Sequence, residues 1–158
     1  MNEYTLAIQV LQKRIEELTD EEKNWMNAAV EAAKKAYAPY SNFQVGAVVI
    51  LSDGTLVTGN NQENAAYPSG LCAERVALFS AGALYPKVPI RAVAIVAMKD
   101  GIIQDEISPC GACRQVLLES EARHNYPIQI LLCGKEEIRI IHSAVTLLPF
   151  SFGIGNLN

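Results

Sequence analysis

Residues 45–59 read VGAVVILSDGTLVTG, and this stretch decides the class of fold. Residues 45–51 are apolar and rich in β-branched side chains, and residues 56–59 resume the pattern after Asp53-Gly54, a strong turn signal. We therefore predict a β-hairpin. Because residues 45–51 do not alternate with polar side chains, we expect their strand to be buried on both faces of a sheet.

Helices and strands alternate on both sides of this hairpin. Thr19-Asp20-Glu21-Glu22 fits a capping box, which predicts a helix that starts after Thr19 and ends before Pro39. The later segments are a helix from Cys72 to about Ala81, a strand from Ala92 to Met98, a helix from Cys110 to about Ser120 and a strand from Ile128 to Cys133. This alternation predicts a layered α/β fold whose later strands are parallel.

The first 18 residues allow two interpretations. Leu6, Ile8 and Val10 alternate as in a strand, whereas Leu11, Ile15 and Leu18 have the spacing of a helix. We divide the chain into an N-terminal extension of unknown role, residues 1–18, and a single domain, residues 19–158. The length of 158 residues is enough for one well-buried core.

The composition excludes several kinds of partner. The net charge is −4 and the Lys and Arg side chains are scattered, which argues against a polynucleotide. The start of the chain lacks a basic segment, and the apolar runs are too short to span a bilayer, so we expect a soluble, cytoplasmic protein without a membrane partner. Cysteines in such a chain are expected to be thiols or metal ligands rather than disulfides.

Three of the four cysteines have the spacing of a zinc site. Cys72 precedes Ala73-Glu74-Arg75, and Cys110 and Cys113 form a C-x-x-C pair, with both groups at the start of a predicted helix. The partial positive charge of a helix N-terminus stabilises a thiolate. Three thiolates can hold one Zn²⁺ and leave a position for water, which is typical of a catalytic rather than a structural site.

Acidic and basic residues flank these ligands. Glu74 follows Cys72 by two residues, close enough to face the metal, where its carboxylate can take a proton from zinc-bound water and deliver it to a substrate. Because three thiolates leave an excess negative charge, we expect Arg75, and also Arg114, to donate hydrogen bonds to the sulfurs and offset it.

Taken together, these motifs resemble a known family. Cys-Ala-Glu-Arg at 72–75, followed by Pro-Cys-Gly-Ala-Cys-Arg-Gln at 109–115, is similar to the zinc signature of the small, homotetrameric cytidine deaminases. Further matches are residues 38–47, residues 61–67 and Leu147-Leu148-Pro149 with Phe152, so that the resemblance covers about residues 19–155. It implies a three-layer α/β/α sandwich with a mixed five-stranded sheet.

The resemblance also implies roles for individual residues. Asn61 and Glu63 would hydrogen-bond a ribose hydroxyl, chiefly the 3′-OH, and Phe43 would line the pocket beside the base. The backbone at Ala73, with Glu74, would read the pyrimidine edge. Tyr67 and Phe152 would reach into the pocket of a neighbouring subunit, so that a homotetramer would share its active sites.

The implied activity is the hydrolytic deamination of cytidine and deoxycytidine to uridine and deoxyuridine plus ammonia, in pyrimidine salvage. The implied substrate is a free nucleoside. One Zn²⁺ per subunit would activate the water that attacks C4, and Glu74 would protonate N3 and then the leaving amino group.

Other interpretations stay open at this point. The chain could deaminate another aminopyrimidine nucleoside, such as blasticidin S, or could edit a polynucleotide, although its acidic balance speaks against the latter. A fourth ligand such as His142 would make the zinc site structural and the chain a scaffold. We expect Cys133 to be a buried thiol, and His124 and His142 to be helix-cap or surface residues.

Overall fold

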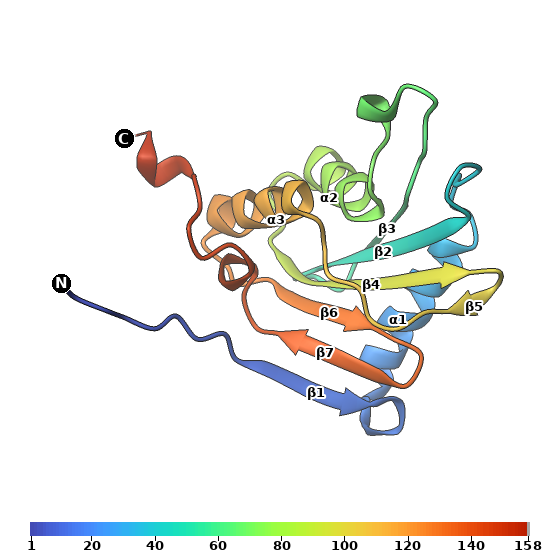
Figure 1. The fold of residues 1–158 in the computed structure, drawn as a ribbon, viewed down its shortest axis with the longest axis horizontal. Helices are drawn as coiled ribbons and strands as arrows, with labels where there is room; N and C mark the ends of the chain where they lie inside the picture. The colour runs from blue at the N-terminus through green and yellow to red at the C-terminus, as the bar shows by residue number, and fades with distance from the viewer. Residues whose placement is uncertain (158) are drawn as a thin grey trace.

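A computed structural model describes residues 1–157 as a mixed β-sheet between two layers of helices (Figure 1). α1 (Asp20–Ala33) covers one face, and α2 (Ala73–Leu84) and α3 (Gly111–His124) cover the other. The strands are β1 (Val10–Arg14), β2 (Phe43–Leu51), β3 (Leu56–Asn60), β4 (Ile90–Lys99), β5 (Ile102–Ile103), β6 (Gln129–Cys133) and β7 (Glu137–Ile141). Short 3₁₀ helices cover Ile15–Glu17, Tyr67–Ser69, Ala144–Leu147 and Ile154–Asn156. The three-layer α/β/α arrangement agrees with the sequence-based prediction.

The number of strands differs from the prediction. The sheet has seven strands in the order β1-β7-β6-β4-β2-β3, with β5 paired to β4, where five were expected. β1 comes from the N-terminal segment that we had left without a role, and β5 is only two residues long. β5 is too short to give a recognisable period, and near β1 the strand-like alternation of Leu6, Ile8 and Val10 competes with the helical spacing of Leu11, Ile15 and Leu18.

The predicted hairpin is present as β2 and β3, which are antiparallel, with Val49 opposite Val57. Gly54 has φ +88° in the turn between them. Residues 45–51 are buried, as expected for a strand covered on both faces. Among residues 1–157, one pair of strands, β4 and β6, is parallel, whereas β7 returns antiparallel to β6. The expectation of parallel later strands therefore holds for β4 and β6 only.

The N-terminal segment is a strand rather than a helix. Residues 10–14 pair antiparallel with β7, with Val10 opposite Ile141. A single 3₁₀ turn follows at Ile15–Glu17, and Leu18 is buried against the α1 layer. Residues 1–9 are exposed and run outward from the sheet (Figure 1).

Two glycines bring the helices close to the sheet. A Cβ atom at Gly46 would lie inside the contact distance of Ala29 O on α1, and one at Gly59 would collide with the backbone of Ala73 and Ala77 on α2. Since a backbone cannot move aside as a side chain can, both positions require glycine. Gly59 thereby fixes where the first turn of α2 lies.

No helix in the described part of the chain is both long enough and apolar enough to cross a bilayer.

Candidate metal centre and substrate groove

The three predicted zinc ligands meet where α2 and α3 begin. Cys72 and Cys110 are the N-cap residues of these helices, and Cys113 lies buried in the first turn of α3. The Sγ atoms are 3.7 Å apart for Cys72 and Cys110 and 3.4 Å apart for Cys110 and Cys113, and all three lie within 4.8 Å of one another. Tetrahedral zinc with bonds of about 2.3 Å requires sulfurs about 3.8 Å apart. The cluster therefore fits one zinc ion.

The helix ends are unusual in having no side-chain cap. Neither Cys72 nor Cys110 accepts a hydrogen bond from the first turn of its helix. Both helix N-termini therefore keep unpaired N–H groups beside the sulfurs, where their partial positive charge favours the thiolate form. The exposed Cys110 lies on the solvent side of the cluster.

Hydrogen bonding within the cluster shifts the pKa values of Cys72 and Cys113 in opposite directions. A hydrogen bond from the Cys113 thiol, together with Arg75 and against the effect of burial, lowers the pKa of Cys72 to about 5. The same hydrogen bond, with burial, raises the pKa of Cys113 far above its usual range. Zinc binding must therefore displace the proton of Cys113.

The two arginines next to the ligands have different partners. Arg75 Nη2 donates to Cys72 Sγ at 3.8 Å, while its Nε is buried without a partner. Arg114 does not donate to the sulfurs, which corrects our expectation. It donates from Nε to Pro109 O at 2.9 Å and from Nη1 to Leu147 O at 3.1 Å. Arg114 thus fixes the backbone that leads into Cys110.

Glu74 lies in the first turn of α2 and is only 4% exposed. Burial, and secondly the negative charge of Cys72, raise the pKa of its carboxyl group above the usual value. A carboxyl group in such surroundings retains a proton at a higher pH than one in water. It is therefore suited to both taking up and giving up a proton beside the metal.

A groove of about 540 Å³ opens beside Cys72. It lies between the loop after α1 and the segment that joins β3 to α2. Its lining comprises Tyr40, Ser41, Asn61, Gln62, Glu63, Asn64, Tyr67, Gly70, Leu71, Cys72 and Arg75. The groove therefore joins one zinc ligand to the two predicted ribose-binding residues.

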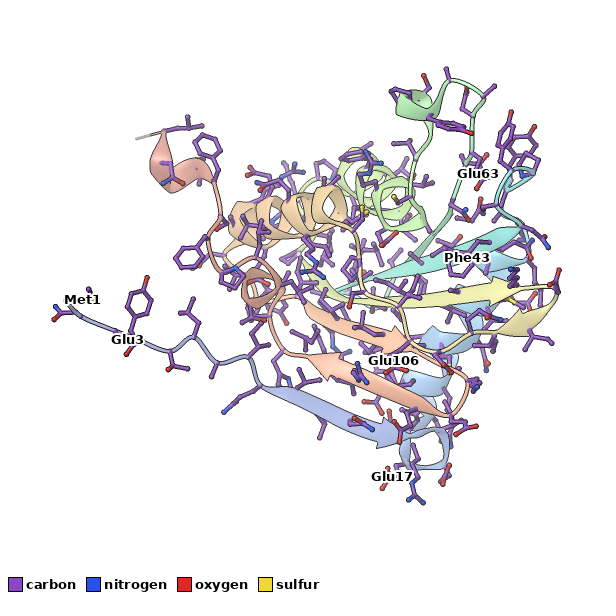
Figure 2. The ribbon with its side chains drawn as sticks, in the orientation of Figure 1. Met1, Glu3, Glu17, Phe43, Glu63 and Glu106 are labelled. Atoms are coloured by element: carbon purple, nitrogen blue, oxygen red, sulfur yellow. The ribbon has the colours of Figure 1, made fainter. Side chains whose placement is uncertain are left out.

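Glu63 is held as an anion at one side of this groove (Figure 2). Its carboxylate accepts hydrogen bonds from the Ser41 hydroxyl, from Tyr40 N at 2.8 Å and from Ser41 N at 3.3 Å. The Ser41 hydroxyl and then the Tyr40 N–H lower the pKa of this carboxyl group. Since a carboxylate has about four acceptor positions, one remains for a ligand.

Asn61 ties the end of β3 to the start of β2. Its Oδ1 accepts from Val45 N at 2.7 Å, and its Nδ2 donates to Phe43 O at 2.9 Å. The amide is thereby oriented, yet one N–H and one lone pair stay free. Asn61 and Glu63 together can accept from one hydroxyl group and donate to it.

The remaining predicted residues are more dispersed. Phe43 is half-buried and packs against the core cluster on the α2 and α3 side, outside the groove lining, and Ala73 is fully buried at the start of α2. Tyr67 is 78% exposed and lies edge-on to Tyr40, with ring centroids 6.4 Å apart.

Phe152 is 62% exposed in the C-terminal segment, where its backbone carbonyl accepts a hydrogen bond from Gln115. Within one chain, Phe152 does not line the groove.

Sequence reasoning missed some of the groove. Ser41, with the Tyr40 backbone, orients Glu63, and Gly70 and Leu71 form part of the lining. Ser41 lies in the matched stretch 38–47, but a serine in a polar loop is not distinguished by sequence alone. Its role depends on a contact with Glu63 across the fold.

The other cysteine and histidine candidates lie apart from the cluster. Within residues 1–157, the sole group of three or more metal-binding side chains is Cys72, Cys110 and Cys113. Cys133 is buried in β6, and His142 is exposed after β7. The cluster therefore keeps the three-ligand count of a site with an open position.

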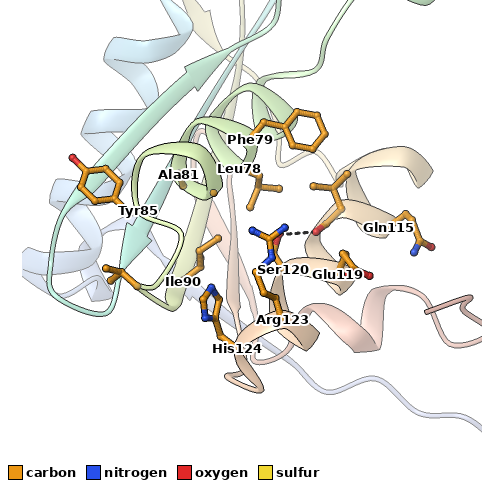
Figure 3. Close-up of a pocket in the computed structure, with 13 residues that line it drawn as sticks. Leu78, Phe79, Ala81, Tyr85, Ile90, Gln115, Glu119, Ser120, Arg123 and His124 are labelled. Carbon is orange, nitrogen blue, oxygen red and sulfur yellow. Dashed lines mark hydrogen bonds between the residues drawn. The ribbon is translucent and has the colours of Figure 1, made fainter. Parts of the chain in front are cut away.

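A second hollow, of about 400 Å³, lies between α2 and α3 (Figure 3). Leu78 and Phe79 of α2 and Gln115 and Glu119 of α3 line it. None of the predicted zinc or substrate residues lines this hollow.

Comparison with known proteins agrees with this geometry. Residues 19–127 match the family model described as the cytidine and deoxycytidylate deaminase zinc-binding region, which includes all three clustered cysteines. The chain belongs to this family. The cysteine cluster is its zinc site and fits one zinc ion per chain.

Individual relatives match different lengths of the chain. A cytidine deaminase from Mycobacterium tuberculosis is 39% identical over 132 residues, which cover 82% of this chain and 87% of that protein. A cytidine deaminase from Halalkalibacterium halodurans is 46% identical over 91 residues, and one from Sporosarcina psychrophila is 46% identical over 89 residues. These two alignments cover 58% and 56% of this chain, and 65% and 62% of the relatives, slightly less than two thirds of their length.

The fold is shared with solved structures. The crystal structure of a cytidine deaminase from Burkholderia pseudomallei has a TM-score of 0.71 and 40% sequence identity, and the match covers 85% of this chain and 100% of that chain. The Mycobacterium tuberculosis enzyme has a TM-score of 0.67 and 33% identity, and the match covers 86% of this chain and 99% of that chain.

Proposed function

We propose that the chain deaminates free cytidine and deoxycytidine by zinc-dependent hydrolysis, giving uridine or deoxyuridine and ammonia, as a cytoplasmic enzyme of pyrimidine salvage. The observation that carries this proposal is the buried carboxyl group of Glu74 beside a three-sulfur zinc site that opens next to a polar groove. Relatives named as cytidine deaminases support the choice of substrate.

Glu74 is the residue that moves protons in this proposal. Cys72, Cys110 and Cys113 would hold the zinc ion, which would acidify a water molecule for attack on C4 of cytosine. Glu74 takes up one proton of that water and delivers it to N3, and then carries the remaining proton of the added hydroxyl group to the leaving amino group. Its burial supports this role, because a raised pKa brings the carboxyl group nearer to neutral pH.

The groove supplies recognition of the ribose. The free acceptor position of Glu63 and the free N–H of Asn61 complement one sugar hydroxyl, which we assign to the 3′-OH. A site built in this way rejects ligands that lack the hydroxyl, because its own polar groups would then stay unpaired. Phe43, with the backbone at Ala73, is proposed to contact the base.

We propose a homotetramer whose subunits share their active sites. Tyr67 and Phe152 are large aromatic residues left 78% and 62% exposed, and Phe79 on the α2–α3 hollow is 51% exposed. Large aromatic side chains that are exposed in one chain can be covered by a second chain in an assembly. In this assembly Phe152 enters the groove of a neighbouring subunit.

The test is uridine formation from cytidine by the purified, zinc-loaded chain, followed by ultraviolet absorbance. Glu74→Gln is expected to lower turnover by at least about a hundredfold while it keeps one zinc per chain, because only the proton carrier is lost. Glu31→Gln, the same change at an exposed position of α1, serves as the matched control and should match the native rate.

Two outcomes would contradict the proposal. If the native chain binds zinc but leaves both cytidine and deoxycytidine unchanged, the substrate assignment is wrong. If Glu74→Gln loses its zinc together with activity, Glu74 is a metal-holding residue and not the proton carrier.

A further inference from the structure

The outer edge of β1 is open, and its hydrogen-bonding groups are aligned for another strand. β1 is the last strand of the sheet, with β7 on one side. Ile15 N donates to Glu136 O, so the backbone N–H and C=O groups of the odd-numbered residues in this segment point toward β7. Successive residues of a strand point their N–H and C=O groups to opposite edges. The backbone groups of Val10 and Gln12 therefore point to the open edge of β1.

The segment that leads into β1 carries apolar side chains that are exposed to solvent, where polar side chains would be usual. Tyr4, Leu6, Ile8 and Val10 alternate along it, and they are 72%, 55%, 45% and 47% exposed. Figure 2 shows the Met1–Glu3 end of this segment well away from the body of the molecule. An open, apolar strand edge has unpaired N–H and C=O groups that can form hydrogen bonds with another strand.

We infer that residues 3–13 pair antiparallel with the same residues of a second copy of this chain, about a two-fold axis at Ile8. In this register Leu6 of one copy lies opposite Val10 of the other, and Tyr4 lies opposite Gln12. Each of these residues is even-numbered and points its backbone groups to the open edge, so the hydrogen-bond pattern of the two strands matches. A register shifted by one residue would pair outward-pointing with inward-pointing groups.

Charge also selects this register. It places Glu3 of one copy opposite Lys13 of the other, on the sheet face that carries α1. Lys13 already bonds Glu22 at 2.7 Å, and its three donors leave capacity for a second carboxylate. Opposite charges across a strand pair stabilise it. The pairing is self-complementary, so each β1 edge takes up one further copy through the same residues.

The sharpest test is disulfide formation by single cysteine variants of the zinc-loaded, full-length chain. In Ile8→Cys the two introduced residues face each other across the axis with Cα atoms about 5.5 Å apart, within the range for a disulfide. In Leu6→Cys the two introduced residues are about 14 Å apart along the strands, too far to bond. Leu6→Cys is therefore the matched control, and the native chain sets the background from its own exposed Cys110.

We expect mild oxidation to convert most of the Ile8→Cys chain, and less than about a tenth of the Leu6→Cys chain, to a covalent dimer on a non-reducing gel. A mixture of Leu6→Cys and Val10→Cys chains should form the crosslink that neither forms alone. Equal crosslinking of Ile8→Cys and Leu6→Cys, or none by either, would overturn the inference. The outcome does not depend on the reaction catalysed, so it is independent of the proposed function.

Discussion

The two helical layers begin their helices in opposite ways. On one face of the sheet, α1 has a complete capping box: Thr19 Oγ1 accepts from Glu22 N, and Glu22 accepts from Thr19 N at 2.9 Å. On the other face, α2 and α3 start at Cys72 and Cys110 with no side-chain cap. The α1 layer satisfies its own helix end, whereas the α2–α3 layer leaves its ends free for sulfur and metal. The face with α1 thus has a self-stabilised helix end, whereas the face with α2 and α3 carries the metal-binding residues.

The largest effect should follow from removing a sulfur at the uncapped ends. Cys113→Ser is expected to lose its zinc and to lower the rate of the proposed deamination by at least about a thousandfold, because the zinc would supply the acidified water for that reaction. Atomic absorption and a uridine assay measure the two losses. Cys133→Ala is the control, because this buried thiol lies in β6 away from the cluster. Zinc retained in Cys113→Ser, or lost in Cys133→Ala, would contradict the assignment of the ligands.

An intermediate effect should separate the two faces directly. Gly46→Ala pushes against α1 and Gly59→Ala against the first turn of α2, so each should lower the free energy of unfolding by about 1–3 kcal/mol. Gly59→Ala should in addition reduce kcat/KM of the folded protein by about tenfold, because Cys72 and Glu74 move with that turn. Urea unfolding and assays at a temperature where both variants are folded give the comparison. Equal activity losses in the two variants would remove the distinction between the faces.

The smallest effect concerns the capped end and depends on pH. Burial opposes the ionisation of Glu22, but the hydrogen bonds that its carboxylate accepts from Lys13 of β1 and from Thr19 together lower its pKa below the ordinary value of 4.5. The stability contributed by the ionised group is therefore complete above pH 4.5 and disappears as the pH falls through the lower, folded-state pKa.

Glu22→Gln should accordingly lower the free energy of unfolding by about 1 kcal/mol at pH 7 and leave zinc content unchanged. The difference between native and variant, measured by urea unfolding, should shrink on acidification below pH 4.5. If the difference in unfolding free energy instead widened below pH 4.5, the folded protein would be more stable with Glu22 protonated than with Glu22 ionised.

Much of the fold could be predicted because its signals are local. The capping box at Thr19, the Asp53-Gly54 turn and the cysteine spacing each depend on residues a few positions apart, and the structure has α1, the β2–β3 hairpin and the cysteine cluster at these places. β1 was ambiguous and β7 was missed, because Val10 becomes part of the sheet only through Ile141 at the other end of the chain.

The candidate site shows the same limit. Glu74 and the three cysteines could be identified from type and spacing, but the partners of their neighbours could not. Arg114 bonds backbone carbonyls at Pro109 and Leu147 instead of a sulfur, and Ser41 orients Glu63 from a separate loop. Such contacts between distant segments follow from tertiary packing and leave no periodic pattern in the sequence.

The path of the chain through the two zinc-bearing helices has a consequence for how the protein folds. β3 and β4 both run antiparallel to β2, and β4 runs parallel to β6, so α2 and α3 each form a crossover between parallel strands. Cys72 belongs to the first crossover, and Cys110 and Cys113 belong to the second. Three sulfurs can surround one ion only after both crossovers have docked, and contacts between such distant segments form slowly. Zinc binding by all three sulfurs therefore requires both crossovers to be docked, and its rate would report how fast a newly made chain reaches that stage.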